Sequence, residues 1–388
     1  MIYVGIDVAS EKHDVCIMNS NGEVFKHIFT ISNHKSEYKK LLNSIEEAKK
    51  LWKDSKVSIG IESTGVYSEV LVNYLSKIED LDIIYINPIL TNMFQHSECV
   101  HYAKTDAADA KGICLYLSSK SKRLFTYTQP SYHIKELKSL SRETKRIGKD
   151  INKIANHLRG VLHVVFPEIF KCFRDICTDT CVELLIKYPT PDLIGNKRSY
   201  SDIYSKLNKG KRIKLDSLKE LAKNTIGSWS ESDELVIKSL AQNLKLLMNQ
   251  KKHFVQRLEV LSRKYCKNLL TVPGIGPINA CTIMGEIGNI SNFHGADSLI
   301  SFAGLNPIVY ESGKYKGTGL SISKKGSPYL RNAIVRSSNI IVMFDDKFRE
   351  YFEKKISEGK PYKVAMGHVS KKLIRVIYQI LKKDVKYV

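Results

Sequence analysis

The first 120 residues alternate short apolar strands with helical segments, and this order constrains the fold more than any other feature. Three strands come first, and an Asn21-Gly22 step before the third is typical of a β-hairpin turn. Apolar spacing then predicts the later elements. The expected strands are 2–6, 14–18, 24–31, 56–61 and 83–86, and the expected helices are 35–52, 66–78 and 106–119. This βββαβαβα order predicts an α/β domain of the ribonuclease H-like class over residues 1–128.

The remaining chain is predominantly helical, and 388 residues exceed the size of one ordinary domain. Long helical patterns at 129–167 and 231–266 predict a coiled-coil or helical linker, which could also dimerise the protein. Residues 168–230, between these patterns, are expected to form a helical insertion. Residues 267–388 are expected to form a mainly α C-terminal domain.

The charge balance points to a polyanionic partner. Lys and Arg number 61 against 40 Asp and Glu, which gives a net charge of +21. Nucleic acid is the usual partner of such a chain, although a basic composition inherited from an AT-rich genome is the plainer interpretation. Residues 311–388 carry 18 basic and 7 acidic residues, so the positive charge is concentrated towards this end.

The sequence shows no signal peptide and no apolar run of the roughly 18 residues that a membrane span needs. A cytoplasmic protein, associated with the nucleoid of a bacterial or archaeal cell, is therefore expected. The eight cysteines form no paired framework, which fits a reducing compartment. Cys172, Cys177 and Cys181 lie close in sequence but lack zinc-site spacing, so we interpret them as core or surface thiols.

Two carboxylates stand at the ends of apolar strands. Asp7 follows the strand at 2–6, and Glu62 follows the strand at 56–61. An unpaired carboxylate is costly to bury there, so a purely structural role is difficult to defend. If the two strands are neighbours, both carboxylates project at one edge of the sheet.

Asp106 and Asp109 add two further carboxylates on one face of a helix. Such a group of oxygen ligands suits Mg²⁺, or Mn²⁺, and a pair of such ions can stabilise the attacking and leaving oxygens of phosphoryl transfer. The alternative is helix capping, because Thr105 is a suitable N-cap and acids in a first turn favour the helix dipole.

Four sequence motifs together resemble those of a known family. They are Gly5-Ile6-Asp7-Val8-Ala9, Glu62-Ser63-Thr64-Gly65-Val66-Tyr67, Asn87-Pro88 and Lys104-Thr105-Asp106-Ala107-Ala108-Asp109-Ala110. In combination they resemble the DEDD transposases of the IS110 family of insertion sequences, whose relatives include the Piv-type DNA invertases. The resemblance covers the chain except 168–230. It implies a RuvC-like domain in which Asp7, Glu62, Asp106 and Asp109 are the metal-binding tetrad.

In the C-terminal domain, Pro273-Gly274-Ile275-Gly276 resembles a helix-hairpin-helix element. Glycines allow backbone N–H groups to approach a phosphate, and the following helix presents its positive end. Gly274 and Gly276 are therefore candidate nucleic-acid contacts. A simple tight turn explains the same residues equally well.

The loop at 311–327 contains several hydroxyls among basic residues, and a hydroxyl that attacks a phosphodiester needs such positive charge nearby. The candidate nucleophiles are Tyr310, Ser312, Tyr315, Ser321 and Ser323. Composition does not choose among them, and a Ser-Gly step is commonly just a turn. The resemblance selects Ser312 as the catalytic serine of a transposase domain, with Lys324, Lys325 and Arg331 as phosphate contacts.

The resemblance implies a transposase or site-specific recombinase that cuts and rejoins DNA through a covalent phosphoserine. It also implies a homo-oligomer, a dimer or tetramer, that acts on donor and target DNA and is guided by a bridge RNA. Other classes remain open. They are a metal-only RuvC-like nuclease or Holliday-junction resolvase, an actin-like kinase, and a non-catalytic DNA-binding protein. The kinase is disfavoured because a second Asp-x-Gly phosphate loop and a glycine-rich adenosine site are absent from the sequence.

Overall fold

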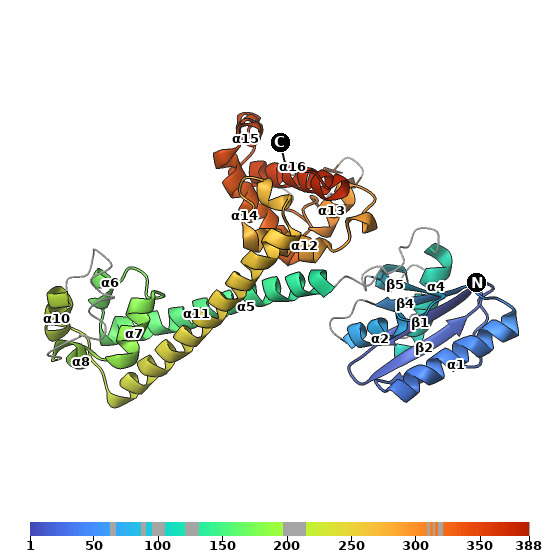
Figure 1. Ribbon diagram of the computed structural model, residues 1–388, viewed down its shortest axis with the longest axis horizontal. Coiled ribbons are helices and arrows are strands. Elements are labelled where there is room, and N and C mark those ends of the chain that lie inside the picture. The colour runs from blue at the N-terminus through green and yellow to red at the C-terminus, as the bar shows by residue number, and fades with distance from the viewer. Residues whose placement is uncertain are drawn as a thin grey trace. The chain divides into compact units, whose positions relative to one another are not determined.

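The computed structural model describes residues 1–62, 67–86, 91–94, 105–120, 132–196, 215–308, 311–312, 315–316 and 321–387. The chain divides into two compact units, residues 1–130 and residues 131–388. Both units contain regular secondary structure (Figure 1).

The N-terminal unit contains a five-stranded mixed sheet in the order β3-β2-β1-β4-β5. Its strands are β1 (Ile2–Val8), β2 (Lys12–Met18), β3 (Phe29–Ser32), β4 (Val57–Glu62) and β5 (Leu81–Ile86). β1 and β3 each pair antiparallel with β2, whereas β1, β4 and β5 are parallel. The antiparallel start and parallel finish predicted for a ribonuclease H-like domain are thus confirmed.

The expected strand at 24–31 is wrong over its first half. Val24 forms only an isolated bridge with Met18, and regular pairing begins at β3. Lys26 has a φ of 54°, a left-handed conformation that a continuous strand does not contain. The chain therefore turns at Lys26 before it joins β2.

Helices cover both faces of this sheet. They are α1 (Lys35–Trp52), α2 (Tyr67–Leu75) and α4 (Asp106–Lys120). Side chains alternate between the faces of a strand. Ile2, Val4 and Ile6 of β1 pack into the core formed with α1 and α2, whereas Tyr3 packs with α4 on the opposite face. Asp7, an odd-numbered residue of β1, therefore belongs to the α4 face.

The second unit contains two long helices. α5 (Tyr132–Val165) and α11 (Glu231–Tyr265) pack antiparallel, as Figure 1 shows. The Tyr265 hydroxyl at the end of α11 lies 3.0 Å from His133 Nε2 at the start of α5. Buried residues recur along α5 every three or four positions, the spacing of a coiled-coil seam. They are Leu137, Ser141, Thr144, Ile147, Ile151, Ala155, Leu158, Leu162 and Val165.

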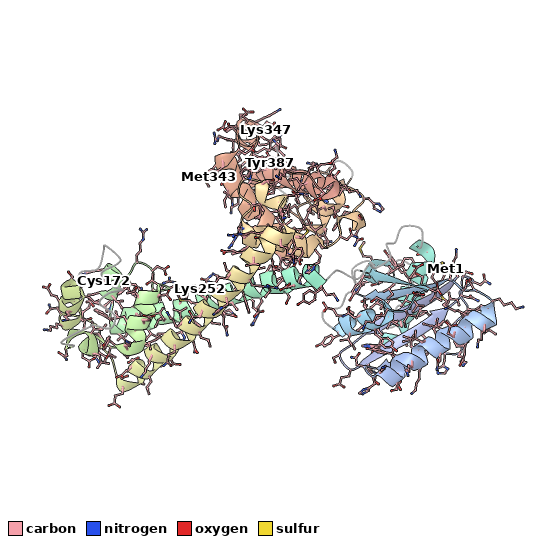
Figure 2. The ribbon with its side chains drawn as sticks, in the orientation of Figure 1. Met1, Cys172, Lys252, Met343, Lys347 and Tyr387 are labelled. Atoms are coloured by element: carbon pink, nitrogen blue, oxygen red, sulfur yellow. The ribbon has the colours of Figure 1, made fainter. Side chains whose placement is uncertain are left out.

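Among the described residues between the long pair, four short helices build a second core against it. They are α6 (Ile169–Cys172), α7 (Asp179–Lys187), α8 (Pro191–Gly195) and α10 (Leu215–Lys223). Cys172 (labelled in Figure 2) and Cys177 are partly buried, Cys181 is fully buried, and all three are free thiols. Among the helices that the structure describes, none is long and apolar enough to cross a membrane.

The C-terminal part is mainly helical. It packs around the end of the α5–α11 pair at which α5 begins and α11 ends. Its helices are α12 (Pro277–Ile287), α13 (Ala296–Phe302), α14 (Pro328–Phe344), α15 (Asp346–Ser357) and α16 (Tyr362–Lys383), with short 3-10 turns at Leu269–Thr271 and Ile290–Asn292. A small hairpin of β6 (Glu311–Ser312) and β7 (Tyr315–Lys316) precedes α14. The chain is thus a mixed α/β domain followed by a mainly helical one.

Candidate metal centre and serine hairpin

Asp7 and Glu62 occupy equivalent places on neighbouring strands. β1 and β4 are parallel, and each carboxylate directly follows the paired residues Ile6 and Ile61. Ile61 packs on the α1 face of the sheet, so strand alternation places Glu62 with Asp7 on the α4 face. The two predicted strand-end carboxylates therefore lie side by side at one edge of the sheet.

A pair of glycines brings α4 close to these strands. Gly5 and Gly60 are register partners, so the sheet surface there carries no side chain. A Cβ on Gly5 would lie 2.1 Å from the carbonyl oxygen of Ala110, and one on Gly60 would lie 2.7 Å from the side chain of Ile113. Only glycine permits this approach. α4 is thereby seated on the sheet, with its first turn directed to the strand ends.

The negative charges of the neighbouring carboxylates affect the ionisation of Asp7. Its pKa is raised from its usual 3.8 to about 6. Burial is the largest cause, followed by the negative charges of Asp109, Glu62 and Asp106. The structure therefore brings the four predicted carboxylates into one electrostatic cluster.

Glu62 is perturbed in the same direction. Burial is the largest cause of its raised pKa, and the charge of Asp109 adds to it. The Thr91 hydroxyl donates a hydrogen bond to Glu62 Oε1, which partly offsets the shift. Two carboxyls with raised pKa values at one edge make this edge a candidate functional site.

The donor chemistry of this cluster fits a hard divalent cation, because all of its ligands would be carboxylate oxygens and they repel one another in its absence. In the described part of the chain, no group of three or more His, Cys, Asp or Glu side chains is arranged to hold a metal ion. Mg²⁺ is commonly held by one or two carboxylates together with water and substrate phosphate. The cluster is consistent with that open type of site.

Asp14 is a fifth carboxylate that the sequence patterns did not identify. It is the cross-strand partner of Asp7 on β2, and its charge also raises the pKa of Asp7. The Thr30 hydroxyl donates a hydrogen bond to its Oδ1. The pairing register of the β1–β2 hairpin is the signal that would have revealed it.

The capping alternative for Asp106 and Asp109 is also correct as local structure. Thr105 Oγ1 accepts a hydrogen bond of 3.2 Å from the backbone N–H of Ala108, as an N-cap does. Lys12 Nζ lies 4.0 Å from Asp106 Oδ2, but both side chains are largely exposed and the pair contributes little. Capping explains how the helix begins, whereas it does not explain why both charges act on Asp7.

Cation binding at this cluster should depend on pH. A carboxylate must be ionised to bind a metal, and Asp7 has a pKa of about 6. We expect Mn²⁺ affinity to fall about tenfold per pH unit below pH 6 and to be constant above about pH 7. Calorimetric Mn²⁺ titrations between pH 5 and 8 measure this. A midpoint near pH 4, the range of ordinary carboxylates, would contradict the assignment.

The second candidate centre lies in the other unit. Ser312 ends β6 and pairs with Tyr315 at the start of β7. Tyr310 lies outside the described residues, and so do the side chains of Ser312 and Tyr315. Lys324 and Lys325, expected to contact phosphate, are exposed after the hairpin.

Arg331 has a clear structural task. Its Nη1 donates hydrogen bonds to the carbonyl oxygens of Ala303, at 3.0 Å, and Lys324, at 3.2 Å. These bonds fasten the segment that follows the hairpin to the end of α13. A direct phosphate contact by this guanidinium remains a prediction.

The two glycines of the helix-hairpin-helix-like element have different structural roles. Gly274 has a φ of 86°, and a Cβ there would lie 2.8 Å from the carbonyl oxygen of Ser337 in α14. Its lack of a side chain is required by packing. Gly276 is the N-cap of α12 and has open space around it. Of the two, Gly276 is better placed to receive a phosphate.

Comparison with known proteins identifies the family of this chain. One family model, of DEDD transposases of the IS110 type, matches residues 4–167, and a second, described as "Transposase IS116/IS110/IS902 family", matches residues 266–353. The chain belongs to this family of transposases. The first match spans all four clustered carboxylates, and the second spans Ser312. The protein is therefore an enzyme that cuts DNA and transfers its strands.

Individual relatives match nearly the whole chain. The "Insertion element IS116 uncharacterized 44.8 kDa protein" of Streptomyces clavuligerus is 22% identical, over 98% of this chain and 94% of its own length. The "Pilin gene-inverting protein" of Moraxella bovis is 23% identical, over 98% of this chain and 96% of its own length. RuvC of Thermus thermophilus, a solved structure, matches with a TM-score of 0.25 and 9% identity, covering 33% of this chain and 99% of that one.

Proposed function

We propose that this IS110-family transposase cuts and rejoins DNA through a covalent phosphoserine formed by Ser312. The carboxylates Asp7, Glu62, Asp106 and Asp109 would hold Mg²⁺ or Mn²⁺ for this reaction. When bound, such an ion supplies Lewis-acid stabilisation of phosphate oxygens. The observation that carries the metal part of the proposal is the place of Asp7 and Glu62 at the ends of neighbouring parallel strands, where the pKa of Asp7 is raised. The choice of Ser312 is supported by the family resemblance.

In the proposed reaction, the hydroxyl oxygen of Ser312 gives up its proton and attacks a backbone phosphorus. A P–O bond to Ser312 forms as one P–O bond of the DNA breaks, and the departing DNA oxygen takes up a proton. A hydroxyl of a second DNA strand then attacks the same phosphorus and releases Ser312. One phosphodiester is exchanged for another, so no nucleotide hydrolysis is needed.

The proposal requires the carboxylate cluster of one unit and Ser312 of the other to act on one phosphate. We propose that they do so between subunits of a homo-oligomer, a dimer or tetramer. Mixing Asp7→Asn protein with Ser312→Ala protein should then restore strand transfer, because some composite sites contain neither change. A mixture as inactive as either variant alone would oppose this arrangement.

We also propose that a bridge RNA guides the enzyme. Support comes from the family resemblance and from the net charge of +21, which suits simultaneous binding of RNA and DNA. Sequencing the RNA that copurifies with the protein should reveal one discrete species encoded beside the gene. Recovery of bulk cellular RNA alone would argue against guidance.

The covalent intermediate is the direct test of the nucleophile. Denaturing wild-type protein during turnover on labelled DNA should trap a protein–DNA adduct. The Ser312→Ala variant should form no adduct, whereas Ser323→Ala, on the same loop, should form it normally. Cleaved DNA without any adduct would instead support the metal-only nuclease, in which water is the nucleophile.

A further inference from the structure

A group of cations surrounds one aromatic ring where α5 meets α14. Tyr329, in the first turn of α14, has the guanidinium carbon of Arg142 at 4.7 Å from its ring centroid and Lys145 Nζ at 4.9 Å. Both cations belong to α5 and lie three residues apart. The ring therefore holds two positive charges together through cation–π contacts.

Further cations add to the same place. The pKa of Lys145 is lowered, first by burial and then by the positive charges of Lys149, Arg336 and Arg331, while the charge of Glu286 partly offsets the shift. Lys149 and Arg336 are exposed, and Lys145 is partly exposed, so the charges face solvent. We call Arg142, Lys145, Lys149, Tyr329 and Arg336 the Tyr329 cluster.

The acids near this cluster are already neutralised. Glu286, whose side chain is 1% exposed, accepts bidentate hydrogen bonds from Arg142 at 2.6 and 3.0 Å and another from Ser327 at 2.8 Å. On α5, Glu143 and Asp150 both pair with Arg146. Arg142 is balanced by Glu286, whereas the charges of Lys145, Lys149 and Arg336 have no ion-pair partner among the described residues.

We propose that the Tyr329 cluster binds the backbone phosphates of the DNA substrate. Residues three or four apart on a helix lie about 5–6 Å apart at Cβ, so Lys145 and Lys149 lie on one face of α5, next to the Arg142–Glu286 ion pair. A polyanion placed along this face relieves the mutual repulsion of the cations and gains counterion release. The proposal depends on DNA as the substrate, and its choice of DNA over RNA rests on the proposed role of Ser312.

The location of the cluster fits this task. Ser327, the N-cap of α14, hydrogen-bonds to Glu286, and Arg331, one turn beyond, fastens the segment at Lys324 that follows the serine hairpin. DNA held at the cluster would therefore lie next to the start of α14, to which the segment after the serine hairpin is bonded. This placement favours DNA over RNA as the partner.

The test uses fluorescence anisotropy to measure how the affinity for a 40-base-pair DNA duplex depends on salt concentration. The triple variant Lys145→Gln, Lys149→Gln, Arg336→Gln should lose about 2–3 units from the slope of log affinity against log salt, at about 0.9 per phosphate contact. Its affinity near 150 mM salt should fall about 10- to 100-fold.

A matched control removes two Lys charges and one Arg charge from the exposed face of α11. It is Lys238→Gln, Lys252→Gln, Arg263→Gln, in which all three side chains are exposed (Lys252 is labelled in Figure 2). Its slope should change by less than about one unit. Equal losses in both triples, or loss of binding to duplex RNA alone, would overturn the proposal. If the cluster triple does not fold, the exposed Lys149→Gln single variant should still lose about one unit of slope, and an unchanged slope refutes it.

Discussion

Asp7→Asn should reduce DNA strand transfer by at least about 10³-fold while making the metal-free protein more stable. Asn keeps the shape of Asp7 but removes one negative oxygen ligand from the carboxylate cluster. Removal of a single neutral hydrogen-bond donor from a transition-state site costs about 10²–10³-fold, and loss of a metal ligand should cost more. The measurement is strand transfer on labelled DNA with saturating Mg²⁺.

The stability change follows from the raised pKa of Asp7. Between pH 4 and 6 the folded protein holds this proton while the unfolded chain releases it, so the metal-free fold loses stability through Asp7 as the pH rises. At pH 7.5 Asp7→Asn should recover about 1–2 kcal/mol, discounted because Asp7 is partly exposed to solvent. Thermal unfolding in a chelator measures this gain.

Asp82→Asn is the matched control for Asp7→Asn. Asp82 is an exposed residue of β5 in the same sheet, outside the cluster. It should change neither strand transfer nor stability appreciably. An Asp7→Asn protein that is inactive and also less stable would indicate a structural role for the carboxylate, contrary to our account.

Gly5→Ala should destabilise the N-terminal unit by at least about 3 kcal/mol, although it adds a single methyl group. That methyl would meet the Ala110 carbonyl at 2.1 Å and the Cys114 backbone nitrogen at 2.9 Å, and backbone atoms cannot rotate away as a side chain can. α4 must therefore lift from the sheet and carry Asp106 and Asp109 with it. Chemical denaturation should show the loss, and Mn²⁺ affinity should fall with it.

Gly160→Ala provides the contrasting case. Gly160 lies within α5, and a Cβ there would meet nothing within 4 Å. Because alanine is the better helix former, this change should stabilise the protein by about 0.5–1 kcal/mol. If Gly5→Ala were as well tolerated, α4 would not be seated on bare backbone as described.

Much of the N-terminal unit could be predicted because its information is local. Short apolar runs define β1 and β4, and the carboxylate after each run predicts that Asp7 and Glu62 share an edge. Likewise, the three- and four-residue spacing of apolar residues predicts the long helices α5 and α11. These patterns depend on neighbours in sequence.

The missed features depend on contacts between distant segments. Asp14 acts on Asp7 only through hairpin register, and Gly5 matters only because a helix more than 100 residues later lies on it. The left-handed Lys26, which shortens the third strand, has no sequence signature. The bonds of Arg331 to two loop carbonyls likewise require the folded chain.

The most direct test of the central claim, that four carboxylates form one divalent-metal site, is calorimetric Mn²⁺ binding by the full-length protein at pH 7.5. The wild-type protein and Asp82→Asn should bind Mn²⁺ equally. Asp7→Asn, Glu62→Gln, Asp106→Asn and Asp109→Asn should each bind at least about tenfold more weakly. Undiminished Mn²⁺ binding by all four variants would contradict the claim.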